Sequence, residues 1–495
     1  MKIFTSLIFS LLLLSALCVS GKNYYITPKG TTTNDGSSFS KPIDLSKALG
    51  LAAAGDSLIL EGGTYPIAYV VDTKNTIVLA QSGQRGKPIY VVSYQNSKAI
   101  IDFSFPAHLW VQNSFGLDIT GSYWYFKGIT ITNAGYHGVY NKGTNNSFVN
   151  CVFSYNKFSG LEINKGGSNT SVINCDAFRN YDPKNLGGSA DGFAPKQTMG
   201  TGNVLIGCRA YENSNDGYDT YDCQNPIVIE NCWAFKNGRL TIGTTEYAGN
   251  KNGFKLGGLE QIQNNKVYNC VAFGHELKGF DENNNNGAIT IYNCIGYKNT
   301  TNFSFSGSIA SGQKHDFKNN ISLSGTNADV IIGSVTHTNH TWNSGFGTSS
   351  NDFKSLDLTL AYADGSLPEN DLFRLKSTSK LIDAGALTGR PYNGLKPDLG
   401  PFETKDLATY LQDLAKNDRN TLVFPTVFDT ELNVRLLSTI DSPKVSIYSM
   451  QGALMHLETI DHSDKSIATV HMVAGKYIVK VENNGLSSSY VVMKL

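Results

Sequence analysis

Six cysteines recur along the middle of the chain at intervals that few folds can produce. They are Cys151, Cys175, Cys208, Cys232, Cys270 and Cys294. Three of the five intervals are 24 residues long, and the other two are 33 and 38 residues long. Repeats of this length, extended in places by loops, suit one coil of a parallel β-helix.

Other residue types keep a constant distance from each cysteine. Five residues later come Asn156, Asn180, Asn213, Asn237, His275 and Asn299, and three residues later come Phe178, Tyr211, Phe235, Phe273 and Tyr297. We expect the cysteines to stack as small buried groups, since free cysteine is often fully buried. The asparagines should stack at a turn, where each amide bonds its neighbours. The repeats therefore predict an all-β fold built on a parallel β-helix.

The two ends of the chain differ from this repeating part. Asp44–Leu49 reads as a short amphipathic helix, which would cap the first coil and protect its open edge. We place the β-helical domain at residues 22–403 and a linker or cap with a helical period at 404–423. Residues 424–495 contain short alternating strands and predict a small β-sandwich domain.

The first 21 residues read as a secretory signal peptide, with a basic start, a short apolar run and small residues at its end. The apolar run is shorter than the ~20 residues that a membrane span needs, so we expect an exported protein without a transmembrane segment. The chain has 41 basic and 41 acidic residues, a balance that gives no reason to expect a nucleic-acid partner. Because the cysteines follow the repeat, we expect buried thiols and not a disulfide framework.

Three short segments between residues 187 and 258 carry the candidate chemistry. Each has the form x-Gly-aromatic, and alignment on Gly192, Gly217 and Gly253 places Asp191, Asp216 and Asn252 in one column. Two residues past each glycine stand Ala194, Asp219 and Lys255. If the segments are neighbouring coils, each column is a line of side chains about 4.8 Å apart.

Stacking of these coils would bring four oxygen-bearing side chains together beside Lys255. The four are Asp191, Asn215, Asp216 and Asp219. Carboxylates in neighbouring strands repel one another unless a cation lies between them, and oxygen ligands of this kind suit calcium. We therefore predict a calcium site with an adjacent base.

The same columns continue into further coils, where His137, Ser159 and Lys278 precede the glycine and Tyr140 and Glu162 follow it. The sequence thus predicts one long polar face along the helix. A solvated strand face is the simpler interpretation of any single coil. It does not explain why negative charge is concentrated in neighbouring coils.

These segments resemble polysaccharide lyase family 9, which contains pectate lyases and related pectin-backbone lyases on a right-handed parallel β-helix. The resemblance rests on Ala190–Ala194, Asn215–Asp219 and Gly253–Gly258 and extends over about residues 22–403. It implies that Asp191, Asn215, Asp216 and Asp219 hold Ca²⁺ and that Lys255 is the catalytic base. Asn215 departs from the family pattern, which has an aspartate there. The C-terminal domain resembles the sorting domains of secreted Bacteroidota proteins, which implies export and surface attachment.

The resemblance implies an acidic plant polysaccharide as substrate, either polygalacturonate or rhamnogalacturonan I, cleaved by β-elimination. The C5 proton of a uronate becomes acidic when its carboxylate charge is neutralised, and a neutral lysine can then remove it. Since a free lysine has a pKa near 10.4, we expect an alkaline optimum. Lys196, Arg239 and Lys251 are candidates for binding other uronate carboxylates.

Two other functions remain open from the sequence. A polysaccharide hydrolase would need two or more carboxylates flanking the bond, one of them protonated. The aspartates could supply them, but Lys255 would have no role. A non-catalytic adhesin or carbohydrate-binding protein fits the regular coils and the tail. It gives no reason for Asp and Lys to cluster in three coils.

Overall fold

The structure is a computed structural model of the 495-residue chain. It describes residues 21–71, 73–243, 246–342, 346–362, 367–390 and 392–404, and then 421–424, 427–428, 431–436, 444–449, 454–460, 464–469, 472–483 and 486–494. The predicted signal peptide lies outside these residues except for its last position, as does nearly all of the predicted linker or cap.

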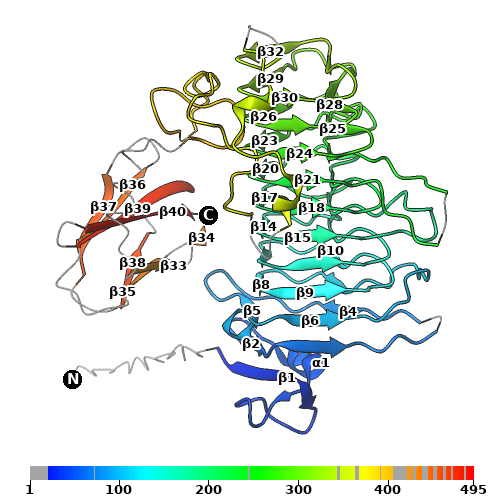
Figure 1. Ribbon diagram of the computed structural model, residues 1–495. Helices are drawn as coiled ribbons and strands as arrows, with labels where there is room; N and C mark the ends of the chain where they lie inside the picture. Colours follow the sequence, from blue (N-terminus) through cyan, green and yellow to red (C-terminus); the bar gives the residue numbers. More distant parts are fainter. Residues whose placement is uncertain are drawn as a thin grey trace, which may run out of the picture.

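Short strands follow one another in groups of three, so that each coil adds one strand to each of three parallel sheets (Figure 1). Sheet A runs in the order β1 (Asn23–Thr31), β2 (Ser57–Leu60), β5 (Ile89–Ser93), β8 (Trp124–Lys127), β11 (Ser147–Val149), β14 (Ser171–Ile173), β17 (Val204–Ile206), β20 (Val228–Glu230), β23 (Lys266–Tyr268), β26 (Thr290–Tyr292), β29 (His315–Lys318) and β32 (Val335–Thr338). Sheet B runs β3 (Gly63–Pro66), β6 (Ala99–Asp102), β9 (Ile129–Thr132), β12 (Val152–Ser154), β15 (Asp176–Phe178), β18 (Arg209–Tyr211), β21 (Trp233–Phe235), β24 (Val271–Phe273), β27 (Ile295–Tyr297) and β30 (Ile321–Leu323). Sheet C runs β4 (Ile77–Leu79), β7 (Leu117–Ile119), β10 (Val139–Asn141), β13 (Leu161–Ile163), β16 (Phe193–Pro195), β19 (Tyr218–Asp219), β22 (Phe254–Lys255), β25 (Lys278–Asp281), β28 (Thr301–Phe305) and β31 (Val330–Ile331). The predicted parallel β-helix is confirmed.

Lines of apolar side chains along the axis fix the register of the coils. In sheet C, Phe193, Tyr218, Phe254 and Phe280 stack with ring centroids 5.4, 4.6 and 4.9 Å apart. All four are buried. A slip of one residue would turn this column to the opposite face of its sheet, and burial therefore selects one register.

The residue before each repeated cysteine forms the turn from sheet A to sheet B. At Asn150, Asn174 and Asn231 φ is 51, 50 and 54°, in the left-handed region, which asparagine tolerates better than most residues do. The cysteine that follows is buried, and the N–H of Cys151 points at Sγ of Cys175 at 3.3 Å. The seven described cysteines are free thiols, which confirms the predicted cysteine column.

The asparagine column is a ladder of hydrogen bonds at the turn between sheets B and C. The backbone N–H and side-chain amide of Asn156 both donate to Oδ1 of Asn180, at 3.0 Å each. Asn180 donates in the same way to Asn213 at 3.2 and 2.8 Å, and Asn213 to Asn237 at 3.0 and 2.9 Å. Each buried amide therefore satisfies groups of two coils.

Helix α1 (Leu45–Leu51) confirms the predicted helix at the first coil (Figure 1). The Asp44 side chain accepts the N–H of Lys47 at 2.9 Å and caps the helix N-terminus. Leu45, Ala48 and Leu49 are buried against the first strands. Three short 3₁₀ helices are η1 (Tyr94–Asn96), η2 (Ser350–Asp352) and η3 (Leu358–Ala361). No helix in the described part of the chain is long and apolar enough to cross a membrane.

Residues after the last coil pack back on the outer face of sheet B. The aromatic column that follows the cysteines lies on this face, where Tyr211, Phe235 and Phe273 stack at 4.7 and 4.9 Å. Phe373 and Phe402 join the apolar cluster that covers them. The sequence predicts the column, whereas the segment that covers it shows no repeat that would place it there.

The C-terminal strands form two small sheets. One has the order β33 (Thr421–Phe424), β35 (Glu431–Leu436) and β38 (Asp464–Ala468), and the other has β34 (Val427–Phe428), β40 (Leu486–Lys494), β39 (Gly475–Asn483), β36 (Lys444–Ser449) and β37 (Leu454–Thr459). Residues of both sheets, such as Val434 and Val479, share one apolar cluster. This confirms the predicted small β domain.

Candidate metal and active site

The candidate site lies on sheet C, where β16, β19 and β22 are consecutive strands. The N–H of Gly192 donates to the carbonyl of Asp216 at 3.0 Å, and the N–H of Gly217 donates to that of Asn252 at 3.0 Å. Asp219 pairs in register with Lys255. The coils therefore stack in the predicted columns. The glycines are needed because a Cβ on Gly192 would lie 2.7 Å from the carbonyl oxygen of Gly217.

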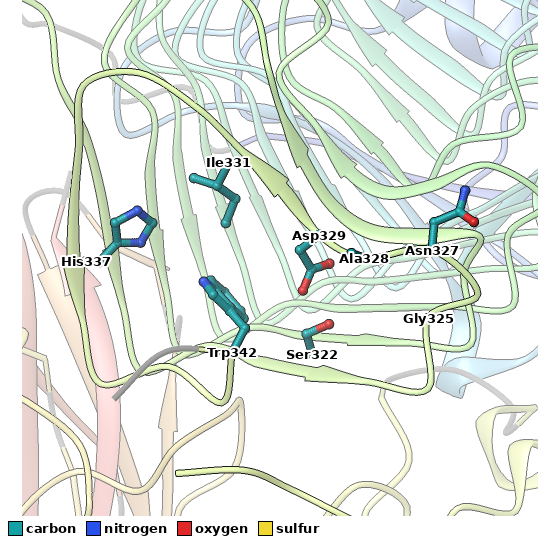
Figure 2. Close-up of a pocket in the computed structure, with 8 residues that line it drawn as sticks. All are labelled: Ser322, Gly325, Asn327, Ala328, Asp329, Ile331, His337 and Trp342. Carbon is teal, nitrogen blue, oxygen red and sulfur yellow. The ribbon is translucent and has the colours of Figure 1, made fainter. Parts of the chain in front are cut away.

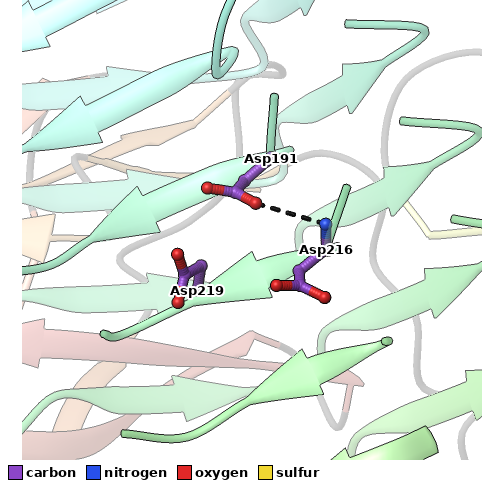
Figure 3. A group of neighbouring side chains, drawn as sticks. All are labelled: Asp191, Asp216 and Asp219. Carbon is purple, nitrogen blue, oxygen red and sulfur yellow. Dashed lines mark hydrogen bonds between the residues drawn. The ribbon is translucent and has the colours of Figure 1, made fainter. Parts of the chain in front are cut away.

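Three carboxylates converge at this point, as Figure 3 shows. Oxygen atoms of Asp191, Asp216 and Asp219 lie within 4.8 Å of one another, and all three side chains are buried. The N–H of Asp216 donates to Oδ1 of Asp191 at 3.2 Å and fixes one carboxylate relative to the next coil. Buried carboxylate oxygens at this separation fit a hard divalent cation such as calcium.

Two lysines lie against the acidic triad. Nζ of Lys196 is 2.9 Å from Oδ2 of Asp191 and 3.0 Å from Oδ2 of Asp219. Nζ of Lys255 is 3.5 Å from Oδ2 of Asp216 and 3.4 Å from Oδ1 of Asp219. The triad thus carries three potential negative charges against two positive ones, and this excess leaves room for a cation.

Burial and the neighbouring charges shift the pKa values of Asp219 and Lys255 in opposite directions. Burial raises the pKa of Asp216 to about 7. Burial would also raise the pKa of Asp219, but the two lysines outweigh it and hold that pKa below its ordinary value. For Lys255, burial lowers the pKa, whereas Asp219, Asp216 and Asp191 together raise it above its ordinary value. Without a cation nearby, Lys255 is therefore charged.

Asn215 holds Asp191 in place. Its side-chain N–H donates to Oδ1 of Asp191 at 2.7 Å, and its Oδ1 accepts the N–H of Asn250 at 2.7 Å. An amide oxygen has a second lone pair, so Asn215 can still offer a ligand atom. Its predicted role as a ligand stays a prediction.

A groove of about 880 Å³ runs along sheet C from the triad toward the N-terminal coils. Lys255, Asp219 and Lys196 line one part, and Glu162 and Tyr140 line another. The predicted long polar face is thus hollowed, and aromatic rings lie among its polar groups.

The other two lysine and arginine candidates lie elsewhere. Lys251 pairs with Glu276 at 2.7 Å, and Nε of Arg239 is 3.7 Å from the same carboxylate. Both cations are partly exposed, and neither is among the residues that line the groove. Of the three predicted substrate-binding cations, the structure places only Lys196 in the groove, and the binding role of all three stays a prediction.

Two neighbours of the site were missed in the sequence. The Tyr221 ring lies under Nζ of Lys255, 4.9 Å from centroid to nitrogen. Nδ2 of Asn250 donates to Oδ2 of Asp216 at 3.3 Å. Tyr221 stands two residues after Asp219, which could have suggested its place. Asn250 comes from a loop without a repeat, and no sequence signal identifies it.

A second cavity of about 530 Å³ lies at the last coils, where Trp342, His337 and Asp329 line it together with Ser322 (Figure 2). Its described lining holds one carboxylate and neither lysine nor arginine. It therefore lacks the cluster of carboxylates and lysines that lines the sheet C groove.

Most of the chain matches known protein families. The family model described as "Pel9A-like, right handed beta helix region" matches residues 24–320, and the model of a secretion system C-terminal sorting domain matches residues 422–494. The first match confirms the right-handed β-helix. The second indicates a protein that is exported or held at the cell surface.

Curated relatives and solved structures agree with this placement. Pectate lyase L of Dickeya dadantii is 48% identical over 385 residues, which are 77% of this chain and 90% of that protein. A crystal structure of pectate lyase Pel9A matches with a TM-score of 0.76 and 47% identity, covering 78% of this chain and 97% of the other. A rhamnogalacturonan lyase structure matches with a TM-score of 0.63 and 27% identity, covering 72% and 97%.

Proposed function

The chain belongs to the Pel9A-like right-handed β-helix family, and on this premise we propose that it is an exported, calcium-dependent pectate lyase. It cleaves galacturonate-containing backbones by β-elimination and leaves a 4,5-unsaturated product. The observation that carries the proposal is Lys255, buried within 3.5 Å of Asp216 and Asp219 in a groove. A lysine set among carboxylates in this way fits a base beside a cation site.

Lys255 removes the C5 proton of the uronate when its amine is neutral. The electron pair of the broken C–H bond forms the C4=C5 double bond, and the bond from C4 to the glycosidic oxygen breaks. The leaving oxygen takes a proton from water. Tyr221 lies against Nζ and orients it, and burial of the lysine keeps bulk water from the amine.

Asp191, Asp216 and Asp219 are the residues that would hold calcium, with Asn215 as a fourth oxygen donor. Bound calcium supplies positive charge that neutralises the uronate carboxylate and makes the C5 proton more acidic. Lys196 holds Asp191 and Asp219 in position through ion pairs of 2.9 and 3.0 Å. In this proposal Lys196 also offers its charge to a carboxylate of the substrate.

The test is growth of absorbance from the unsaturated uronide, with polygalacturonate and rhamnogalacturonan I as separate substrates. We expect calcium-dependent growth that a chelator abolishes. Lys255→Ala should lower kcat by about 10²-fold or more, since a positioned base contributes that much. Lys318→Ala, on sheet A, is the matched control. Reducing ends without absorbance would mean hydrolysis, and no cleavage of either substrate would favour a binding protein.

A further inference from the structure

The groove changes character between the acidic triad and the coils before it. Backbone hydrogen bonds from Gly138 to Ser159 and from Gly160 to Asp191 continue the same stacking toward the N-terminus, at 3.1 and 3.0 Å. In these earlier coils Tyr136 and Phe158 stand two residues before the aligned glycine. In the coils of the triad, Ala190 and Asn215 hold the same position. Aromatic rings thus replace small and polar groups.

These rings form one connected wall of the groove. Tyr136 and Phe158 lie 4.5 Å apart between centroids, and Phe115 stacks on Tyr140 at 4.6 Å. Phe115 and Tyr136 are 5.4 Å apart and join the two pairs. Tyr136 and Phe158 are half-buried and line the groove. Part of each side chain is therefore exposed to the groove, and pyranose C–H groups can pack on exposed ring surface.

Glu162 lies beside this wall, between Tyr140 and Ala194 in the outward column of sheet C. Its Oε1 accepts the side-chain N–H of Asn164 at 2.8 Å, and its Oε2 is 3.3 Å from Nε2 of His137. Glu162 and His137 are both buried and line the groove. An ionised carboxylate is only an acceptor, so it suits the hydroxyl donors of a sugar.

The cations near this wall have carboxylate partners or are exposed. Nζ of Lys142 is 2.6 Å from Oδ1 of Asp118, and Lys196 pairs with the triad. Lys74 and Lys165 line the groove but are exposed, where solvent screens their charge. A uronate carboxylate placed over Glu162 would meet a like charge. Lys196 is the buried cation whose charge reaches Glu162, and it is already paired with Asp191 and Asp219.

We propose that Tyr136, Phe158 and Glu162 form a subsite for an uncharged pyranose unit of the substrate chain. The ring packs on the two aromatic side chains, and its hydroxyls donate to Glu162. This inference rests on the proposed lyase function. It adds a preference for an uncharged sugar unit at one to two coils from the triad. The uncharged unit is either a methyl-esterified galacturonate or the neutral sugar of an alternating backbone.

The alkaline condition under which Lys255 works strengthens this preference. Burial raises the pKa of Glu162 to about 7, with Asp191 and Asp219 acting in the same direction and Lys196 and the Asn164 amide acting against it. Glu162 is therefore ionised at the pH at which the base is neutral. An ionised Glu162 repels a uronate and accepts hydrogen bonds from an uncharged sugar more strongly.

Binding to full-length protein carrying Lys255→Ala tests the subsite without turnover. Calorimetry with calcium would compare oligosaccharides of polygalacturonate, of methyl-esterified polygalacturonate and of rhamnogalacturonan I. The double change Y136A/F158A should weaken binding of at least one of the last two by about tenfold. Binding of polygalacturonate oligosaccharides should change less than about twofold. Whichever substrate loses affinity identifies the uncharged unit, and Tyr90→Ala on sheet A is the control.

Glu162→Gln provides a second variant that keeps the volume of the side chain. It should raise the affinity for polygalacturonate oligosaccharides several-fold by removing a like charge. Equal losses on all three ligands in Y136A/F158A, a loss confined to polygalacturonate, or no binding of either uncharged-unit ligand would overturn the subsite. Absence of unsaturated product from the unmutated enzyme on every substrate would instead overturn the lyase function, and the binding data would still decide the subsite.

Discussion

Lys255 is held by the same carboxylates that would hold the cation, and this sets the direction of its pH dependence. Asp219, Asp216 and Asp191 outweigh burial and raise its pKa. A cation among these carboxylates offsets their charge and lowers the lysine pKa again. In the proposed mechanism, the cation that neutralises the substrate carboxylate would therefore also favour the neutral form of Lys255.

The rate should rise with pH, because only the neutral amine accepts the C5 proton. Higher calcium should move the pH of half-maximal kcat/KM downward. The measurement is kcat/KM against pH at two calcium concentrations, with Lys318→Ala as the control. An acidic optimum, or a midpoint that does not move with calcium, would argue against Lys255 as the base.

Glu162 makes a separate prediction about stability. Burial raises its pKa from 4.5 to about 7 in the folded chain. As pH rises, the Glu162 carboxyl therefore loses its proton in the unfolded chain before it does so in the folded chain. The free energy of unfolding falls between these two pH values and then levels off. The total loss is about 3 kcal/mol.

Glu162→Gln should remove this loss, so that the variant gains stability over the native chain at pH 8 but not at pH 4. Urea unfolding at both pH values measures it, and Glu61→Gln, at an exposed site, is the control. Equal urea midpoints for the variant and the native chain at pH 8 would contradict the burial argument.

Within the coils, the asparagine ladder supplies hydrogen bonds to the turn between sheets B and C. Asn213 accepts two N–H groups of Asn180 and donates to the carbonyl of Ala177 at 2.9 Å. Both neighbours are buried, so water cannot replace these bonds. The ladder therefore joins the four consecutive coils that contain Asn156, Asn180, Asn213 and Asn237 at the turn between sheets B and C.

Asn213→Ala should lower the free energy of unfolding by about 3 kcal/mol, because it leaves buried donors of Asn180 without an acceptor. Chemical unfolding followed by circular dichroism would measure the change. Asn351→Ala, at an exposed position, should change stability little. Similar effects of both variants would show that the ladder contributes no more than an exposed asparagine.

In the molecule as a whole, the groove and the C-terminal strands are formed by different parts of the chain. Every described residue that lines the groove lies between Lys74 and Lys255. The C-terminal strands have their own apolar cluster. Lys476 pairs with Glu230 at 2.6 Å, and Glu230 also pairs with Arg390, so loss of Lys476 leaves this buried carboxylate a partner.

Removal of residues 421–495 should leave kcat/KM on polygalacturonate unchanged, because the site and its supporting coils remain. Export or surface attachment should be lost, since the sorting domain match covers residues 422–494. Activity of the shortened and full-length proteins, purified in parallel, gives the comparison. A large fall in kcat/KM would mean that the C-terminal unit supports the groove.

The coil and the columns can be predicted from the amino-acid sequence alone. A coil repeats one backbone conformation, so the left-handed turn before Cys175 and the ladder at Asn180 recur in the sequence at the period of the structure. Because the coils stack in register, Asp191, Asp216 and Asp219 lie close together although they are separated in the sequence. Residues in register can therefore be placed from sequence alone.

The contacts that loops and remote segments make with these coils depend on how the folded chain packs. Lys251 faces Glu276 and not the groove, and Asn250 reaches Asp216 from a loop without a repeat. The segment containing Phe373 covers the aromatic column of sheet B from more than 70 residues beyond Tyr297. A loop follows no period, and its position results from packing against surfaces that exist only once the coils have formed.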